Sequence, residues 1–362
     1  MAEHLLTNRE TIGERYRIER FIGEGGMQEV YLAKDLKFAK PVAVKVPKNR
    51  SVVKRFTRSA VVSAKVTHPN VAKTFDYIKG DDRDYLIEEY IEGYNLQQRL
   101  DDEFVRFDPH LTAHCIHHLA KGLSASHHAG VVHRDLKPSN VMVSGDAQLD
   151  TVKITDFGIA KMAEEEIDTA VRAGDEESIT GSQTVVGALP YMAPELFETD
   201  AEISFAADIW SVGALLYHLL IGERPFGRGL QAVPRIVAAK LPERQQILRV
   251  NQQFEGIVND LWTIIAACLK KAPSERPSAD QLSQLLASIS YSTAHRSVGR
   301  IYNYRVGPGA WGFIADDFGN DYFFHADSFY GGRPQNGMRV NFAWCPGRPR
   351  GRAFPVVELR TG

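Results

Sequence analysis

Runs of alternating apolar and polar residues dominate the first quarter of the chain, and helical spacing follows them. Alternation with a period of two is typical of half-buried strands, whereas apolar residues three and four positions apart indicate one face of a helix. On this basis residues 55–66 are predicted to form a helix that interrupts a set of strands. The predicted strands cover residues 16–22, 30–35, 41–46, 71–77 and 85–89.

From Leu111 onward the apolar spacing becomes helical. Ile257, Leu261 and Ile264 keep the spacing of a buried helix face. Residues 278–281 (SADQ) predict an N-terminal capping box, and the helix that they open should end near Ile289. A group of strands followed by a group of helices predicts an α+β fold.

The character of the sequence changes after this last helix. Residues 291–298 are polar and are predicted to form a linker. Residues 299–360 show short aromatic strands separated by Gly, Pro and Asp, which predicts a small all-β domain. The expected organisation is therefore an α+β unit over residues 14–290, with a small lobe over 14–92 and a large lobe over 93–290, followed by a barrel.

Composition favours a globular protein that is neither secreted nor inserted in a membrane. The chain has 362 residues, of which 44% are hydrophobic and 24% are charged. The longest apolar run, near residues 211–221, is shorter than the roughly 20 residues that a membrane span needs. No signal peptide is recognised, and the three cysteines fit neither a disulfide framework nor a zinc pattern. We expect a cytoplasmic protein.

Charge is distributed unevenly along the chain, whose net charge is −2. From Arg296 to the end there are nine arginines, no lysine, four aspartates and one glutamate, a net charge of +4. The preceding residues must therefore be acidic. Such a split suggests that the two parts of the chain have different partners.

Residues 133–140 (HRDLKPSN) and the later Asp156 form the strongest chemical pattern in the chain. They combine a carboxylate at Asp135, a cation at Lys137, an amide at Asn140 and a second carboxylate at Asp156. Phosphoryl transfer needs such a set, because one group orients a hydroxyl, one cation faces the moving phosphoryl group and two oxygen ligands hold magnesium.

These motifs resemble those of bacterial-type serine/threonine protein kinases, and the resemblance covers residues 14–290. Residues 22–30 (IGEGGMQEV) look like the glycine-rich loop, although Gln28 stands at the third glycine of that pattern. Residues 42–45 (VAVK) look like the strand that carries the phosphate-binding lysine. The resemblance implies a bilobal kinase fold, ATP and Mg²⁺ as cofactors, and protein substrates that the sequence does not identify.

The resemblance also implies a role for each residue of the catalytic motif. Asp135 would orient the substrate hydroxyl and accept its proton, Lys137 would stabilise the γ-phosphoryl group, and Lys45 would contact the α- and β-phosphates. A lysine at position 137 points to Ser/Thr rather than Tyr substrates. Asn140 and Asp156 would hold magnesium. The implied nucleotide-binding residues are Gly23, Gly25, Gly26, Val30, Ala43, Lys45, Glu88, Glu89, Asn140 and Asp156.

Scaffold roles follow from the same resemblance. Glu195 of the segment 193–195 (APE) would pair with Arg276, and Asp208 would accept hydrogen bonds from the backbone of the catalytic loop. Arg134 would receive a phosphate group carried by the loop over residues 159–186. This loop is acidic, and its candidate sites of autophosphorylation are Thr169, Ser178, Thr180, Ser182 and Thr184.

The chain departs from the kinase pattern at three further positions. Ser59 stands where a helix glutamate usually pairs with the strand lysine, and Ala188 stands where a threonine usually bridges the catalytic Asp and Lys. Glu88 occupies the usually apolar gatekeeper position. Our hypothesis is that Glu88 supplies the carboxylate missing at Ser59; if the alignment is shifted by one residue, Glu88 points to solvent instead. The departures leave a pseudokinase scaffold as the alternative reading.

The tail resembles a cold-shock domain, a five-stranded barrel of the OB type. The segments that carry the resemblance are residues 299–304 (GRIYNY), 311–314 (WGFI), 321–325 (DYFFH), 337–342 and 351–353. The resemblance implies that Trp311, Phe313, Phe323 and His325 present rings to unstacked bases of single-stranded RNA or DNA. Arginines of the tail would then contact phosphates.

Two readings of the tail compete with nucleic-acid binding by a kinase. Asn303 stands where the cold-shock family has an aromatic residue on the first strand, and Ala326 replaces another aromatic residue after the histidine. Because any small barrel needs aromatic core residues, the tail could instead dock a regulatory protein. It could also be the functional unit itself, a nucleic-acid-binding protein regulated by a kinase-like lobe.

A cluster of histidines at positions 110–128 raises the question of a metal site. The spacing of His110, His114 and His117 places them on one helix face. No carboxylate or cysteine joins them convincingly, so packed or solvent-facing histidines are favoured over a zinc site.

Overall fold

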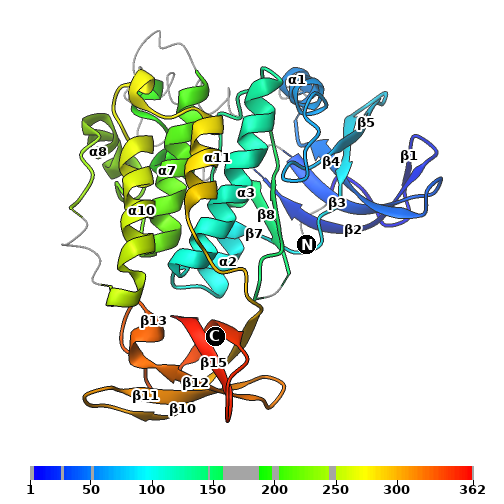
Figure 1. The fold of residues 1–362 in the computed structure, drawn as a ribbon. Coiled ribbons are helices and arrows are strands. Elements are labelled where there is room, and N and C mark those ends of the chain that lie inside the picture. Colours follow the sequence, from blue (N-terminus) through cyan, green and yellow to red (C-terminus); the bar gives the residue numbers. More distant parts are fainter. Residues whose placement is uncertain are drawn as a thin grey trace.

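The computed structural model describes residues 4–25, 28–49, 53–145, 147–157, 187–197, 204–243 and 250–360. A strand-rich lobe lies beside a helical lobe, and a barrel lies against the end of the helical lobe (Figure 1). Gly26 and the candidate phosphorylation loop at residues 159–186 lie outside the described residues, so their proposed roles stay predictions.

Antiparallel strands form the six-stranded sheet of the small lobe, in the order β1-β2-β3-β4-β6-β5. Its core includes Tyr16, Tyr31, Val44 and Ile87, each at most 1% exposed. Helix α1 (Val53–Ser63) packs beside the sheet (Figure 1). The strands are β1 (Thr11–Ile12), β2 (Tyr16–Glu24), β3 (Gln28–Asp35), β4 (Lys40–Pro47), β5 (Thr74–Lys79) and β6 (Asp84–Glu89).

Most of the predicted elements of this lobe are present. Strands β2, β3, β4 and β6 lie within two residues of the predicted bounds, and α1 begins and ends two to three residues early. The strand predicted over residues 71–77 begins instead at Thr74. Val71, which is fully buried, forms an isolated bridge with Ile154 of the large lobe, and this contact explains its apolar character.

Long helices make up the large lobe, and their shared core is fully buried around α3 and α7. The capping box predicted at Ser278 is present, because the Ser278 side chain accepts from the Gln281 amide and the Gln281 side chain accepts from the Ser278 amide. The helices are α2 (Leu96–Asp102), α3 (Pro109–His128), α7 (Phe205–Ile221), α8 (Val233–Ala238), α10 (Gln252–Cys268) and α11 (Ala279–Ser288).

A short hairpin of the large lobe holds two of the predicted site residues. Strand β8 (Val141–Ser144) pairs with β9 (Thr151–Ile154) on one side and with β7 (Tyr94–Asn95) on the other. Asn140 directly precedes β8, and Asp156 follows β9 by two residues. The Thr155 amide donates to the Asn140 carbonyl at 2.9 Å, so the open end of the hairpin brings Asn140 and Asp156 together.

The tail forms a closed barrel of five strands, as predicted. Antiparallel pairs link neighbouring strands in the order β12-β11-β10-β14-β15, and a parallel pairing of β12 with β15 closes the barrel. Strand β13 (Phe329–Tyr330) adds to β15. The barrel strands are β10 (Arg296–Arg305), β11 (Trp311–Asp316), β12 (Asp321–His325), β14 (Arg339–Cys345) and β15 (Gly351–Glu358).

Apolar side chains of the barrel belong to the core of the large lobe. Tyr330, Val357 and Leu359 are at most 2% exposed and lie in the same buried cluster as α3, α7 and α10. The ring of Phe354 stacks on Phe254 of α10 with ring centroids 5.3 Å apart. The barrel is therefore packed onto the lobe, with a continuous hydrophobic interface, rather than tethered beside it.

A buried ion pair anchors the first barrel strand to the large lobe. The guanidinium of Arg296 contacts the Asp108 carboxylate, and both side chains are at most 3% exposed. The second oxygen of Asp108 caps α3 by accepting from the His110 and Leu111 amides. Arg296 also donates to Asn341 Oδ1 at 2.8 Å, and Asn341 Nδ2 donates to the Ala147 carbonyl in the β8–β9 turn at 3.1 Å.

These contacts change the description of the predicted linker. Residues 296–298 of the segment 291–298 already belong to β10 and pair with β14. The Arg296 amide and the carbonyls of Thr293 and Ala294 bond to the Gln148 side chain.

The part of the chain that the structure describes contains no helix long and apolar enough to cross a membrane.

We expect Arg296→Met to destabilise the whole protein strongly, because it leaves the Asp108 carboxylate buried without its cation. Loss of one partner of a buried pair typically costs about 3–5 kcal/mol. The double variant with Asp108→Asn, which keeps an oxygen to cap α3, should recover part of that loss. The free energy of urea unfolding measures both. Arg300→Met, on the exposed side of the same strand, is the control; an equal effect of the two single variants would contradict the anchor.

Candidate functional site

A cavity of about 1430 Å³ lies between the two lobes. Residues of β2, β3, β4 and β6 line it from the small lobe, and residues of α2 and the catalytic loop line it from the large lobe. Small-molecule sites usually measure roughly 300–1,000 Å³. The cavity is therefore large enough for a nucleotide together with part of a second substrate.

Lys45 lies between two carboxylates at the inner end of this cavity. Its Nζ is 2.5 Å from Glu88 Oε2 and 2.8 Å from Asp156 Oδ1. Lys45 is 6% exposed and Glu88 4% exposed, so these charges are largely withdrawn from water. Antiparallel pairing of β4 with β6 sets Ala43 opposite Glu88 and thereby brings the Glu88 side chain to the lysine. The geometry agrees with the hypothesis that Glu88 faces Lys45, not solvent.

Electrostatics within this triad follow from burial and proximity. Burial lowers the pKa of Lys45, but the two carboxylates outweigh it and raise the pKa above its ordinary value. Burial, with the charge of Asp156, raises the pKa of Glu88 despite the neighbouring cation. For Asp156, burial acts upward, yet Lys45 and the Gln28 amide hold the pKa below its ordinary value. Asp156 is thus the more firmly ionised carboxylate of the two.

Backbone bonds to Asp208 hold the catalytic loop in shape. The fully buried Asp208 carboxylate accepts from the His133 and Arg134 amides, each at 2.8 Å. Arg134 has a φ of +72°, a strained conformation that these bonds stabilise. The expected scaffold pair is also present, since Arg276 donates to both oxygens of Glu195 at 2.7 Å.

Asp135 sits among donors at the floor of the cavity. Lys137 Nζ lies 2.8 Å from Asp135 Oδ2, and Asn140 Nδ2 donates to the same oxygen at 3.0 Å. Ala188, which lacks the bridging hydroxyl, is 3% exposed and packs in an apolar cluster with Leu189. The direct ion pair therefore joins Asp135 to Lys137 without the threonine that the pattern predicts.

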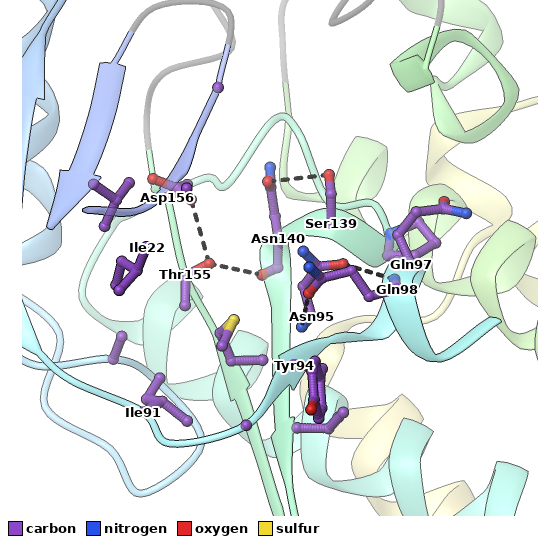
Figure 2. A pocket seen from close by; sticks show the side chains of 18 of the residues that line it. Ile22, Ile91, Tyr94, Asn95, Gln97, Gln98, Ser139, Asn140, Thr155 and Asp156 are labelled. Carbon is purple, nitrogen blue, oxygen red and sulfur yellow. Dashed lines mark hydrogen bonds between the residues drawn. The ribbon is translucent and has the colours of Figure 1, made fainter. Parts of the chain in front are cut away.

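The residues predicted to hold magnesium present suitable oxygens. Asn140 Oδ1 has a long hydrogen bond of 3.4 Å from Ser139, and Asp156 Oδ2 has one of 3.4 Å from Thr155. Figure 2 shows Asn140 and Asp156 facing the cavity with Thr155 between them. Amide and carboxylate oxygens that have no short hydrogen bond from a described residue fit the ligand preference of Mg²⁺.

Other predicted nucleotide-binding residues line the same cavity, namely Gly23, Gly25, Val30, Ala43 and Glu89. A Cβ added at Gly23 or Gly25 would meet no described atom within 4 Å, so the packing of the protein does not require glycine there. The close approach of a ligand to this backbone would require glycine at both positions. The Glu89 carboxylate, in contrast, is engaged by Lys153 Nζ at 2.7 Å, which leaves mainly its backbone for a nucleotide.

In the sequence, Gln28 stands out only because it occupies the position of a glycine. In the structure Gln28 Nε2 donates to Asp156 Oδ1 at 2.8 Å and lines the cavity. The signal that could have identified it is an amide at a loop position that normally has no side chain.

On the barrel, the four predicted stacking residues share one side of β11 and β12. Register sets Trp311 opposite His325 and Phe313 opposite Phe323, while the alternating Gly312 and Ile314 face the core. The Trp311 and Phe323 centroids are 6.0 Å apart, and those of Phe313 and Phe323 are 6.2 Å apart. Arg305 lies over Trp311 and Arg350 over Phe313.

Tyr302 joins this aromatic face and was missed by sequence reasoning. Its ring stacks on Phe313 with centroids 5.6 Å apart. The family resemblance places the first-strand aromatic position at Asn303 and so predicts no aromatic residue there. Tyr302 pairs with Phe313 in regular register, and the irregularity that follows it includes Asn303, which adopts a φ of +49°. The aromatic face thus comprises Tyr302, Trp311, Phe313, Phe323 and His325.

The clustered histidines have packing partners. His117 Nδ1 bonds to Tyr291 at 2.8 Å, and His110 Nδ1 accepts from the Ser292 amide at 3.0 Å. These two bonds hold the segment after α11 against α3. Among the described residues no group of three or more His, Cys, Asp or Glu side chains could hold a metal ion.

The structure combines a strand-rich lobe with a helical lobe and places a lysine, a base and two oxygen ligands around one cavity. This combination is typical of ATP-dependent phosphotransferases. The chain belongs to the protein kinase domain family, which matches residues 16–286. The barrel lies outside that match.

Curated relatives of the chain are serine/threonine-protein kinases of bacteria. A probable kinase of Clostridium perfringens, CPE1738, is 32% identical over 273 residues, which are 73% of this chain and 36% of that protein. PknB of Mycobacterium leprae is 30% identical over 284 residues, 75% of this chain and 42% of PknB. PkaA of Streptomyces coelicolor is 32% identical over 295 residues, 77% of this chain and 50% of PkaA. The chain thus spans about a third to a half of these relatives.

We expect Glu88→Met to raise the dissociation constant for Mg²⁺·ATP about tenfold or more, because Lys45 then loses one of its two described carboxylate partners and keeps Asp156. Glu88→Gln keeps the size of the side chain and isolates the effect of its charge. Titration calorimetry measures the affinity. Adding Ser59→Glu to Glu88→Met should restore part of the affinity by returning a carboxylate to α1. Wild-type affinity in both Glu88 variants would contradict the hypothesis that Glu88 replaces the helix glutamate as the partner of Lys45.

Proposed function

We propose that the protein transfers the γ-phosphoryl group of ATP to serine or threonine hydroxyls of protein substrates. The observation that carries this proposal is the convergence of Asp135, Lys137 and Lys45 with Asn140 and Asp156 around one cavity. Each has the chemistry that phosphoryl transfer needs. The proposed place of action is the cytoplasm, and the loop over residues 159–186 is a candidate site of autophosphorylation.

In the proposed reaction Asp135 orients the attacking hydroxyl and accepts its proton. Its Oδ2 is held by Lys137 and Asn140, so the remaining oxygen, Oδ1, is the one directed at substrate. Lys137 lies close enough to the same carboxylate to place its positive charge beside the transferred group. No threonine is needed for this contact, because the ion pair of 2.8 Å is direct.

On the nucleotide side, Lys45 would bind the α- and β-phosphates while Glu88 holds its ammonium group in place. Magnesium, when bound by Asn140 and Asp156, would neutralise phosphate charge. Asp156 is suited to this role since its pKa is held below the ordinary value. The proposed pocket therefore keeps the complete set of charges even though the helix glutamate is absent from Ser59.

Asp135→Asn should reduce the incorporation of γ-phosphate into protein at least about a hundredfold, because the amide cannot accept the proton from the hydroxyl. Incorporation of labelled phosphate into the protein itself and into a generic basic protein measures the activity. Asp260→Asn, exposed on α10, is the matched control. Equal incorporation by wild type and Asp135→Asn, including none in either, would favour the pseudokinase scaffold.

We also propose that the barrel binds single-stranded RNA or DNA on its aromatic face. Tyr302, Trp311, Phe313 and Phe323 are partly exposed and close together, and two arginines flank them. Stacking of bases on such rings tolerates many sequences, and arginines can contact the phosphates. Strand β11, which carries Trp311 and Phe313, lies on the side of the barrel away from the large lobe (Figure 1), so the docked barrel can still receive a strand of nucleic acid there.

Trp311→Ala combined with Phe323→Ala should weaken binding of single-stranded RNA and DNA by about tenfold to a hundredfold, since each stacked base contributes roughly 1–3 kcal/mol. Fluorescence anisotropy at one fixed salt concentration measures it. Phe318→Ala is the matched control, because Phe318 is 88% exposed on the loop between β11 and β12 and outside the aromatic face. Unchanged affinity in the double variant would overturn stacking and favour a protein-docking barrel.

A further inference from the structure

Gln28 forms a direct link between the glycine-rich loop and the large lobe. It is the first residue of β3, and its side chain is directed into the cavity, where Nε2 donates to Asp156 Oδ1 at 2.8 Å. Only 7% of Gln28 is exposed. A buried amide that bonds to a carboxylate makes a charge-assisted hydrogen bond, which is stronger than one between neutral groups. Glycine, the usual residue at this position, has no side chain to make it.

The backbone of Gln28 also defines the turn of the loop. Its carbonyl accepts from the Gly25 amide at 2.8 Å, while β3 pairs with β4 so that Gln28 lies opposite Pro47. Because the N–H and C=O groups of one strand residue point to the same side, the backbone of Gln28 is directed at β2 and not at Pro47. The side-chain bond to Asp156 is therefore an additional restraint on the loop, and it acts at the first residue of β3.

Lys45 and Gln28 donate to the same oxygen of Asp156. Both Lys45 Nζ and Gln28 Nε2 lie 2.8 Å from Oδ1, whereas the bond that Oδ2 accepts from a described residue is the 3.4 Å bond from Thr155. Two donors on one oxygen fix the rotation of the carboxylate. They leave Oδ2 to face the side on which Asn140 lies (Figure 2).

We propose that Gln28 is a positioning residue, which fastens the glycine-rich loop to Asp156 before nucleotide arrives and turns Asp156 Oδ2 toward the metal site. The proposal rests on the proposed function for the identity of the ligand, Mg²⁺ with a nucleotide. Its physical consequence is preorganisation, because a loop that is already closed loses less conformational entropy when the ligand binds. Gln28 thus replaces the flexibility of a third glycine by a hydrogen bond between the lobes.

Hydrogen exchange of the nucleotide-free, full-length protein tests the restraint directly. In Gln28→Ala the amides of residues 20–25 and 28–32 should exchange about tenfold faster than in wild type, since a hydrogen bond to a charged group is lost. Gln28→Glu keeps the size but replaces the donor by a second carboxylate beside Asp156. It should exchange at least as fast as Gln28→Ala, and the dissociation constant for Mg²⁺·ADP should rise about tenfold in both variants.

Gln97→Glu supplies the matched control. Its amide also donates to a carboxylate, Asp101 at 2.9 Å, and it lines the same cavity, but it does not touch Asp156. It should leave exchange of the loop unchanged. Wild-type exchange in both Gln28 variants, or equal acceleration in Gln97→Glu, would overturn the proposal.

Failure of the restraint can be told apart from failure of the proposed function. The exchange measurement needs neither nucleotide nor catalysis. If the Gln28 variants exchange faster but the wild-type protein transfers no phosphoryl group, the restraint by Gln28 is supported and the proposed kinase activity is contradicted. If the protein is an active kinase but its Gln28 variants exchange like wild type, the proposed function is supported and the restraint by Gln28 is contradicted.

Discussion

Lys45 and its two carboxylates are the interaction on which the arrangement of the lobes depends. A lysine this deeply buried is costly unless it is paired, so the fold must supply negative charge from its surroundings. Glu88 supplies it from β6 within the small lobe, and Asp156 supplies it from the large lobe. Because the second bond crosses between lobes, it also sets the position of Asp156 relative to the glycine-rich loop, where Gln28 adds a further donor.

The β8–β9 hairpin connects this site to the barrel. Its open end brings Asn140 and Asp156 together, and its turn accepts a hydrogen bond from Asn341 of β14. Arg296 joins the same network through Asn341 and through Asp108, the cap of α3. The barrel is thus a structural part of the large lobe. Strand β11, which carries Trp311 and Phe313, lies on the side of the barrel away from the helices of the large lobe (Figure 1).

Much of the fold and of the candidate site could be predicted from sequence because local patterns specify it. The strands of the small lobe, the capping box at Ser278 and the catalytic motif are all local. Even the carboxylate beside Lys45 could be inferred, since Glu88 stands at a position that is usually apolar in the family pattern. Tyr302 was not predicted because the family resemblance put the first-strand aromatic position at Asn303, whereas Tyr302 is the residue that pairs with Phe313. Gln28 could be recognised only as a departure, because its partner lies 128 residues away.

The sequence by itself determined which chemical groups the protein possesses and the order of its strands and helices. Residue type and short-range periodicity are sufficient for both. Only the tertiary structure decided which groups meet: that Lys45 is shared by Glu88 and Asp156, that Gln28 reaches Asp156, and that Arg296 is buried against Asp108. The physical reason is that buried charges require partners at specific distances, and these partners come from segments that only folding brings together.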